Sequence, residues 1–363
     1  MKNILLAVCL FFAGAAGATV HTVNNNGGSP MFTTIQAAVT AAADGDTIHV
    51  MGSNVAYTGF SVIDKKLAFV GPGFAPVKNV PTAATIGGVV ELVNTAATGS
   101  PTGTEFNGLT FGNVVYASTT SNGGTIGINS LKFIRCHFIN SVYFTLGSTG
   151  GLFESCIFSY QLLFSSSYNY SNFIFQNNLF YFQTCCIGNQ IHGLQNAANI
   201  LFDHNLFMAL GAGSNQIFSG CNSLNLTNNI FNRTNAGPGN TLSTFTNNIT
   251  NNVSGTNGNT PWLINGNNGT GNLPNTNPQI NAQAGVDAGS TNYLLDFEIA
   301  AGPANNGGSD GKDIGLLHEP TGSLNFKNAR TSRFPVIGEF NILNPNIAPN
   351  GTLNVQVKAY RVN

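Results

Sequence analysis

The fold is decided by an eight-residue stretch, Leu131-Lys132-Phe133-Ile134-Arg135-Cys136-His137-Phe138, which recurs along the chain. Copies without gaps occupy residues 173–180, 200–207 and 224–231, and residues 151–158 fit the same frame. The first and third places of each copy are mostly apolar and would point to one face of a strand, while the place between them would point to the other face. A period of two is typical of a strand that buries one face.

The repeat also produces columns of one residue type. Its third and eighth places are mostly Phe, and its sixth place is Cys in two copies and then Asn. The sixth-place residues are Cys136, Cys156, Asn178, Asn205, Asn229 and Asn248. A unit this short cannot bury its apolar face alone, so the copies must stack. Stacked strands lie about 4.8 Å apart, which brings Phe onto Phe and Asn onto Asn.

We therefore predict an all-β fold, a right-handed parallel β-helix. Leucine-rich repeats show regular Leu spacing, and propellers need antiparallel blades, so both fit less well. The variable distance between copies places the extra residues in loops. We also expect the Asn column to adopt the left-handed backbone conformation that the turn between two strands requires.

Both ends of the repeat carry signs of closure. Residues 34–43 have an apolar stripe with helical spacing, and this helix is predicted to cap the open end of the solenoid. Residues 234–282 are rich in Asn, Gly and Thr, which indicates long loops on the last coils. Residues 334–358 alternate again and predict two or three terminal strands, docked along the solenoid or forming a small separate sheet.

These features carry a family resemblance. The segment Thr34-Ile35-Gln36-Ala37-Ala38, the Asn column and the turn-rich closure at residues 308–315 resemble the pectate-lyase-like superfamily of right-handed β-helix proteins. Residues 334–340 are similar to the tails of secreted β-helix proteins from Bacteroidetes-type bacteria. The resemblance covers roughly residues 30–318, and we expect a β-helix domain over residues 19–318 and a C-terminal β extension over 319–363. It does not imply one activity, because the superfamily includes lyases, hydrolases, epimerases and adhesins.

Composition and the first residues bear on location and partners. Charged residues make up only 7% of the chain and the net charge is -1, which argues against nucleic acid as a partner. Lys2, the apolar residues 4–12 and Ala16-Gly17-Ala18 are typical of a signal peptide over residues 1–18. We expect secretion or surface display, with a retained anchor as the alternative, and no later transmembrane segment. The five remaining cysteines are interpreted as buried thiols.

A candidate catalytic site follows from the few charged residues of the repeat. Glu154 and Asp203 share the outward fourth place, with Gln176 between them, about 10 Å apart over two rungs. That separation is near the upper end of the range for inverting glycosidases. Arg135 and His204 lie beside them in sequence, so one hypothesis is a saccharide site in which Arg135 meets a substrate carboxylate. The alternative is a set of solvated turn residues.

Three further features have a structural and a functional interpretation. Tyr160 and Tyr181 are candidates for stacking on sugar rings, although alternate members of the aromatic series must be core. Asp310 and Asp313 suggest either calcium binding or a structural turn, and we expect the turn, with no metal or cofactor. The seventh place is mostly apolar yet points outward. It is predicted to lie under loops or under residues 334–358, with a partner surface as the alternative.

The function expected from the sequence is that of a secreted or surface β-helix protein that binds glycan or another envelope component without catalysis. The alternative is a polysaccharide lyase or glycoside hydrolase that acts on an acidic polysaccharide through Glu154 and Asp203.

Overall fold

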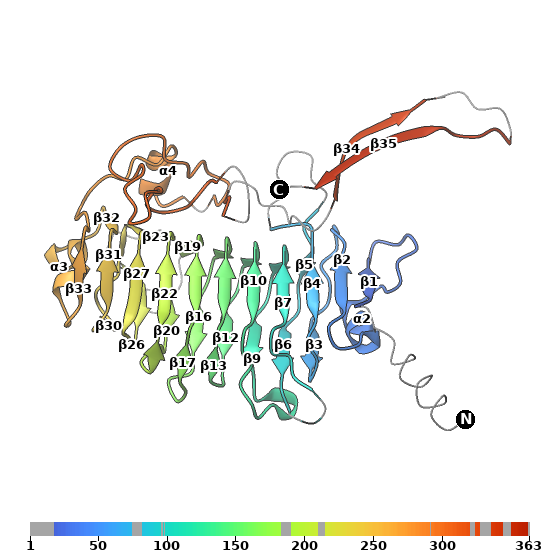
Figure 1. Ribbon diagram of the computed structural model, residues 1–363, viewed down its shortest axis with the longest axis horizontal. Helices are drawn as coiled ribbons and strands as arrows, with labels where there is room; N and C mark the ends of the chain where they lie inside the picture. The colour runs from blue at the N-terminus through green and yellow to red at the C-terminus, as the bar shows by residue number, and fades with distance from the viewer. Residues whose placement is uncertain are drawn as a thin grey trace, which may run out of the picture.

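The repeat folds into a parallel β-solenoid of about nine turns (Figure 1). The structure is a computed structural model that describes residues 18–74, 82–95, 97, 99–182, 190–209, 215–290, 292–319, 324–326, 335–343 and 350–361. The predicted signal peptide lies outside the described residues except for Ala18, and so do Cys185 and Cys186. The predicted fold class is confirmed.

Three parallel sheets form the wall of the solenoid, and each coil contributes strands to them in turn. Sheet A contains β1 (Val20–Val23), β2 (Thr47–Val50), β4 (Ala68–Val70), β7 (Glu105–Asn107), β10 (Lys132–Ile134), β14 (Leu152–Glu154), β18 (Ile174–Gln176), β22 (Ile200–Asp203), β27 (Leu224–Thr227), β31 (Thr244–Thr246) and β33 (Asn268–Thr270). Sheet B contains β5 (Thr85–Ile86), β8 (Thr110–Phe111), β11 (His137–Phe138), β15 (Ile157–Phe158), β19 (Leu179–Phe182), β23 (Leu206–Ala209), β28 (Ile230–Asn232) and β32 (Ile249–Asn251).

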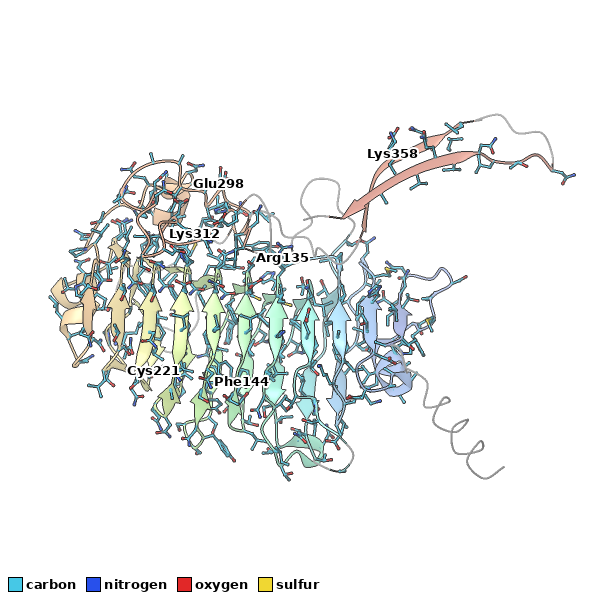
Figure 2. All side chains as sticks on the ribbon, viewed as in Figure 1. Arg135, Phe144, Cys221, Glu298, Lys312 and Lys358 are labelled. Carbon is cyan, nitrogen blue, oxygen red and sulfur yellow. The ribbon has the colours of Figure 1, made fainter. Side chains whose placement is uncertain are left out.

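Sheet C and several short pairings complete the coils. Sheet C contains β3 (Phe60–Ile63), β6 (Val90–Val93), β9 (Val115–Ser118), β12 (Val142–Phe144), β16 (Leu162–Phe164), β20 (Ile191–His192) and β25 (Phe218–Ser219). The short pairings join β13 (Ser148–Thr149), β17 (Tyr170–Ser171) and β21 (Ala197–Ala198), then β24 (Asn215–Gln216) with β29 (Thr234–Asn235), and β26 (Cys221–Asn222) with β30 (Asn240–Thr241). Inward side chains of the coils fill the interior, among them Phe144 and Cys221 (Figure 2).

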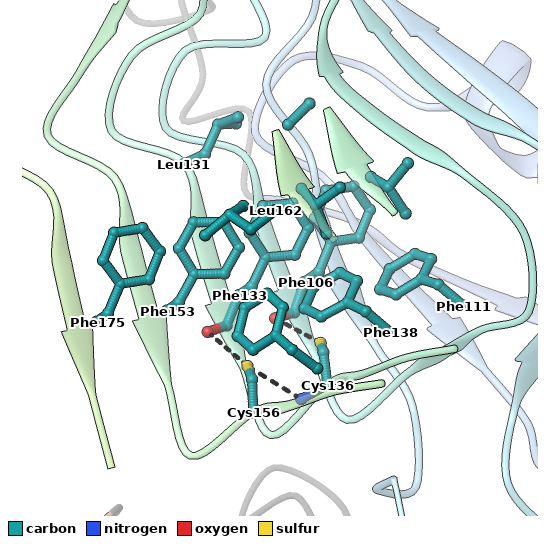
Figure 3. Close-up of a cluster of buried hydrophobic side chains, with 14 of the residues drawn as sticks. Phe106, Phe111, Leu131, Phe133, Cys136, Phe138, Phe153, Cys156, Leu162 and Phe175 are labelled. Carbon is teal, nitrogen blue, oxygen red and sulfur yellow. Dashed lines mark hydrogen bonds between the residues drawn. The ribbon is translucent and has the colours of Figure 1, made fainter. Parts of the chain in front are cut away.

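The predicted Phe columns are real ladders. Phe133 pairs in register with Phe106 on one side and Phe153 on the other. The ring centroids of these pairs are 5.0 and 4.9 Å apart and the rings are nearly parallel (Figure 3). Offset aromatic stacking of this kind adds to the free energy gained from burying the rings. The third-place column therefore forms a continuous aromatic stack inside the solenoid from Phe69 to Phe202, where Leu226 follows.

The sixth-place Asn column is a hydrogen-bonded ladder at the corner between sheets A and B. The Asn205 side-chain amide donates to Asn229 Oδ1 at 2.9 Å, and Asn205 Oδ1 accepts from the Asn178 backbone N–H at 2.9 Å. Cys136 and Cys156 continue this column as buried free thiols. Cys221 is a third buried free thiol. The predicted Asn ladder is confirmed, and so are buried thiols at these three cysteines.

The left-handed residue of this corner is the fifth place and not the sixth, which corrects our expectation for the Asn column. Arg135, Ser155, Asn177, His204 and Asn228 have φ between 50 and 58°. The chain turns sharply here because one residue with positive φ redirects the strand. The sixth-place side chain is thereby turned inward and can bond its neighbours above and below.

The ends of the solenoid are closed by short helices. Helix α2 (Ile35–Ala41) caps the first coils, and the Thr34 hydroxyl accepts the Ala37 backbone N–H at 3.2 Å. This confirms the predicted capping helix. At the other end lie α3 (Thr256–Asn259) and the 3-10 helix η2 (Pro261–Leu263), which carries the buried Trp262. A further 3-10 turn, η1 (Ser121–Gly123), lies on a loop of the wall.

A C-terminal segment covers the outer face of sheet B. We call residues 273–326 the cover, which includes α4 (Gln283–Asp287). Apolar side chains of the cover form a second buried cluster with the seventh-place column of sheet B. The column members are Ile157, Leu179, Leu206, Ile230 and Ile249, and the cover members include Ile280, Val286, Phe297, Ile314, Leu316 and Phe326. The apolar column therefore lies under a loop segment, as one of our two structural alternatives predicted.

The terminal strands form a separate antiparallel hairpin. Strands β34 (Pro335–Ile342) and β35 (Val355–Arg361) pair with each other, and Figure 1 shows the hairpin projecting away from the solenoid. Of the two predicted locations for residues 334–358, docked or appended, the structure has the appended one. No hairpin residue whose side chain the structure describes belongs to the cluster over sheet B.

Candidate functional site

The outer face of sheet A is the exposed face on which the predicted site residues lie. On strands β10 to β33 the outward second and fourth places are all partly or fully exposed. The second-place residues are Lys132, Leu152, Ile174, Leu201, Asn225, Thr244 and Asn268, and the fourth-place residues are Ile134, Glu154, Gln176, Asp203, Thr227, Thr246 and Thr270. We call this surface the open face.

The middle of the open face has two parallel stripes of different chemistry. Leu152, Ile174 and Leu201 are in register on neighbouring strands and form an apolar ridge, with Ile174 39% exposed. Glu154, Gln176 and Asp203 are in register beside it. Period-two alternation places both stripes on one side of the sheet. A ligand lying across these rungs meets an apolar ridge and a polar ladder together.

The polar ladder is held in place by amides. The Gln176 side-chain amide donates to Asp203 Oδ2 at 3.0 Å, and the Asn228 side-chain amide donates to Asp203 Oδ1 at 3.1 Å. Both carboxylate oxygens of Asp203 thus have a fixed donor. Glu154 lies two rungs from Asp203, which is about 10 Å at about 4.8 Å per rung. The register therefore places the two carboxylates two rungs apart on one face.

The two basic residues of the predicted site lie near these carboxylates but are buried. Arg135 is 2% exposed and His204 is 1% exposed. Both occupy the left-handed fifth place of the corner, which turns their side chains under neighbouring segments of the same polypeptide. Burial lowers the pKa of Arg135, while the nearby Glu154 carboxylate opposes that shift. A guanidinium without solvent access does not meet a substrate carboxylate, so this part of the catalytic hypothesis loses its geometric basis. A catalytic role for Glu154 and Asp203 stays a prediction.

His204 instead joins the solenoid to the cover. Its Nε2 atom lies 3.2 Å from Asp310 Oδ2 and 3.8 Å from Asp203 Oδ1. Burial raises the pKa of Asp310, but hydrogen bonds from the Lys312 backbone and from His204, and the charge of His204, bring it below its usual value. The Asp310 side chain also closes the turn that follows it, because the Lys312 backbone N–H donates to Asp310 Oδ1. This carboxylate is occupied within the protein, as expected for a structural turn.

The cover follows the same corner over several coils. The Leu317 backbone N–H donates to Asn177 Oδ1 at 2.7 Å, and the Ser309 N–H donates to Asn228 Oδ1 at 2.8 Å. Gly315 has φ of 95°, and a Cβ there would lie 2.5 Å from Ile230 Cδ1. Only glycine permits this approach. The cover therefore ends at the edge of the open face and leaves that face accessible.

The two tyrosines proposed for sugar stacking lie in different settings. Tyr181 is 5% exposed and packs in the cluster under the cover, with its ring centroid 6.2 Å from that of Tyr293. Its ring is not accessible to a sugar, which corrects that prediction for Tyr181. Tyr160 is partly exposed in the bend between β15 of sheet B and β16 of sheet C, and it is not on the open face.

The last strands of sheet A carry a polar platform. On each of these strands an outward Asn or Thr lies on either side of the inward third place. The members of the platform are Asn225, Thr227, Thr244, Thr246, Asn268 and Thr270. In the described part of the chain their side chains have no hydrogen bond to other protein groups. Amide and hydroxyl groups each retain donors and acceptors for a ligand. The platform extends the open face by three rungs.

Comparison with known proteins gives no assignment. The chain matches no known protein family, and no curated protein matches its sequence at a significant level. Among the described residues, no three or more His, Cys, Asp or Glu side chains converge as metal ligands. No helix in the described ranges has the length and apolar character needed to cross a bilayer.

Sequence reasoning missed two features of the surface. The cover was expected only as unspecified loops, because residues 273–326 show no repeat that aligns them with sheet B. A cavity of about 430 Å³ lies within the cover and is lined partly by Asp313, which the sequence suggested as a turn residue or a calcium ligand but not as part of a cavity. The local sequence signal for this cavity is the group of charged residues Lys312, Asp313 and Glu319 in a chain that has few charges.

Proposed function

We propose that this protein is a secreted or surface β-helix protein that binds a neutral polysaccharide along the open face without cleaving it. The observation that carries the proposal is the contrast in exposure between the outer faces of sheets A and B. The outward positions of β10 to β33 keep solvent contact, whereas the outward column of sheet B is buried. Secretion is part of the proposal and is supported by the leader-like sequence of residues 1–18.

The chemistry of the open face favours a saccharide. A pyranose ring has apolar C–H faces and a polar rim of hydroxyls. The apolar ridge of Leu152, Ile174 and Leu201 suits the C–H face of the sugar. The polar ladder of Glu154, Gln176 and Asp203 suits its hydroxyl groups. An apolar contact stabilises binding in proportion to the area it removes from water. Carboxylates and amides on a partly exposed surface accept and donate to hydroxyls.

The repetition of the face favours a polymer over a single sugar. Equivalent side-chain pairs recur about every 4.8 Å along the solenoid. An extended chain that lies across the rungs contacts several pairs at once, and linked weak contacts give an overall affinity far above each one. The polar platform of β27, β31 and β33 lengthens the path. A neutral chain is preferred to an acidic one, because Glu154 and Asp203 outnumber the one cation of the open face, Lys132, and Arg135 is buried.

Affinity electrophoresis through gels that contain single polysaccharides, both neutral and acidic, tests the proposal. We expect retardation by at least one neutral polysaccharide and a loss of about tenfold in affinity for Ile174→Ala, as expected for one lost apolar contact. Ile63→Ala is the matched control, because Ile63 on sheet C is 41% exposed and Ile174 is 39% exposed. Equal weakening by both variants, or no retardation in any gel, would contradict the proposal.

The alternative is a lyase or hydrolase that acts through the two carboxylates. Reducing-sugar and unsaturated-product assays on the same panel distinguish it from binding. Product formation that Glu154→Gln abolishes would establish the enzyme. Retardation without product supports the binding function.

A further inference from the structure

The cover contains its own cavity, separate from the residues of the open face. It has a volume of about 430 Å³ and lies between residues 281–300 and 306–319 of the cover. This volume falls in the usual range for small-molecule sites. Figure 2 labels Glu298 and Lys312, which line it from the two segments. Ile299 and Leu317 are buried and supply apolar surface to its lining.

The polar lining of the cavity is mainly acidic. Glu298, Asp313 and Glu319 contribute three carboxylates, and Lys312 contributes one ammonium. The Lys312 Nζ atom lies 3.0 Å from Glu319 Oε1, so its charge is already balanced within the protein. With His318 neutral, the lining holds two more negative than positive charges. A ligand with positive charge is favoured over an anion.

Two carboxylates retain an oxygen for a ligand. Asp313 Oδ1 accepts the Asn306 backbone N–H at 2.8 Å, and Glu319 Oε1 pairs with Lys312. The second oxygen of each carboxylate makes no hydrogen bond or ion pair within the described part of the chain. The side-chain amides of Asn281 and Asn306 also line the cavity. Fixed acceptors beside amides and apolar surface suit a compact ligand that carries both an ammonium and hydroxyl groups.

We propose that the cavity binds a small hydroxylated primary amine, with an amino sugar as the representative class. The protonated amine donates to Asp313 and Glu319, and Asn281 and Asn306 bond the hydroxyls. The ring lies against Ile299 and Leu317. This site is independent of the polysaccharide function proposed for the open face.

Isothermal titration calorimetry of the full chain with glucosamine tests the site, with N-acetylglucosamine, glucose and putrescine as comparison probes. We expect glucosamine to bind and N-acetylglucosamine and glucose to bind at least tenfold more weakly, since a charge-assisted hydrogen bond contributes more than a tenfold change. Putrescine supplies the ammonium without hydroxyls and is expected to bind more weakly than glucosamine. Equal binding of the neutral sugars, or tighter binding of putrescine, would overturn the proposal.

Variants locate the binding. Asp313→Asn keeps an acceptor for the Asn306 N–H but removes the charge, and Glu319→Gln does the same beside Lys312. Each is expected to reduce glucosamine affinity at least tenfold with an unchanged melting temperature. Glu339→Gln, which removes a carboxylate from the hairpin, is the control and leaves the affinity unchanged. If neither cavity variant changes the affinity, the site is wrong, and Ile174→Ala reports separately on the open face.

Discussion

Sheets A and B are built by the same repeat, yet only one of them keeps an open outer face. The outward fourth place of sheet A is polar at Glu154, Gln176 and Asp203, and it stays partly exposed. The outward seventh place of sheet B is apolar at Leu179, Leu206 and neighbouring positions, and the cover buries it. A column of outward apolar residues in a solenoid therefore indicates a segment that closes over it, because an exposed stripe of that size promotes association.

The largest expected difference between the two faces is in stability. Leu206→Ala removes a fully buried side chain between sheet B and the cover, and we expect a loss of about 2 to 5 kcal/mol in unfolding free energy. Leu201→Ala, on the open face of the same coil, removes a partly exposed side chain and should cost less than about 1 kcal/mol. Chemical denaturation of both variants measures the difference. Equal losses would show that the two faces are not distinguished by burial.

The second prediction concerns pH and a histidine under the cover. His137 is buried beside Tyr293, with its Nε2 atom 2.8 Å from Ser159 Oγ, and burial lowers its pKa to about 4. A histidine with a depressed folded-state pKa contributes full stability above its usual pKa of 6.5. That stability is lost as the pH falls from 6.5 to about 4, because only the unfolded chain takes up the proton.

The expected loss over this window is about 3 kcal/mol, since each pKa unit corresponds to about 1.4 kcal/mol. Denaturation curves collected across the window measure it. The variant His137→Leu removes the titrating imidazole and should therefore flatten the pH dependence of stability. An apolar side chain suits this position because its neighbour in the column is Ile157. An unchanged slope in the variant would assign the dependence to other groups.

A third prediction compares an internal and an external asparagine. Asn205→Ala breaks the ladder and leaves the Phe175 carbonyl oxygen and the Asn178 backbone N–H without their partners. We expect a cost of about 2 kcal/mol, the penalty for buried polar groups that lose a hydrogen bond. Asn225→Ala on the open face should change the stability by less than about 0.5 kcal/mol. A cost for Asn225→Ala equal to that of Asn205→Ala would contradict the ladder's role.

The smallest expected effect is in the hairpin. Lys358 Nζ lies 2.5 Å from Glu339 Oε2, but the Lys358 side chain is largely exposed. Lys358→Ala should therefore change the melting temperature of the solenoid hardly at all, with a cost below about 1 kcal/mol. A larger shift would mean that the hairpin contributes to the stability of the body.

The sequence predicted the ladders because their periodicity is local and repeated. Phe133, Phe153 and Asn205 fall at equivalent places whatever the loops between them, so stacking alone determines their neighbours. The partners of Arg135 and His204 could not be predicted in this way. Their burial depends on the positive φ of the fifth place and on Asp310, 106 residues from His204 in sequence. No local period reports a contact of that kind.

Hydroxyl-radical footprinting with mass spectrometry tests the contrast between the faces most directly in the unmodified protein. The account predicts strong oxidation of Ile174 and Leu201 on the open face and protection of Leu179 and Leu206 beneath the cover. Added polysaccharide should then protect Ile174 and leave the covered residues unchanged. Oxidation of Leu179 and Leu206 as strong as that of Ile174 in the free protein would contradict the account.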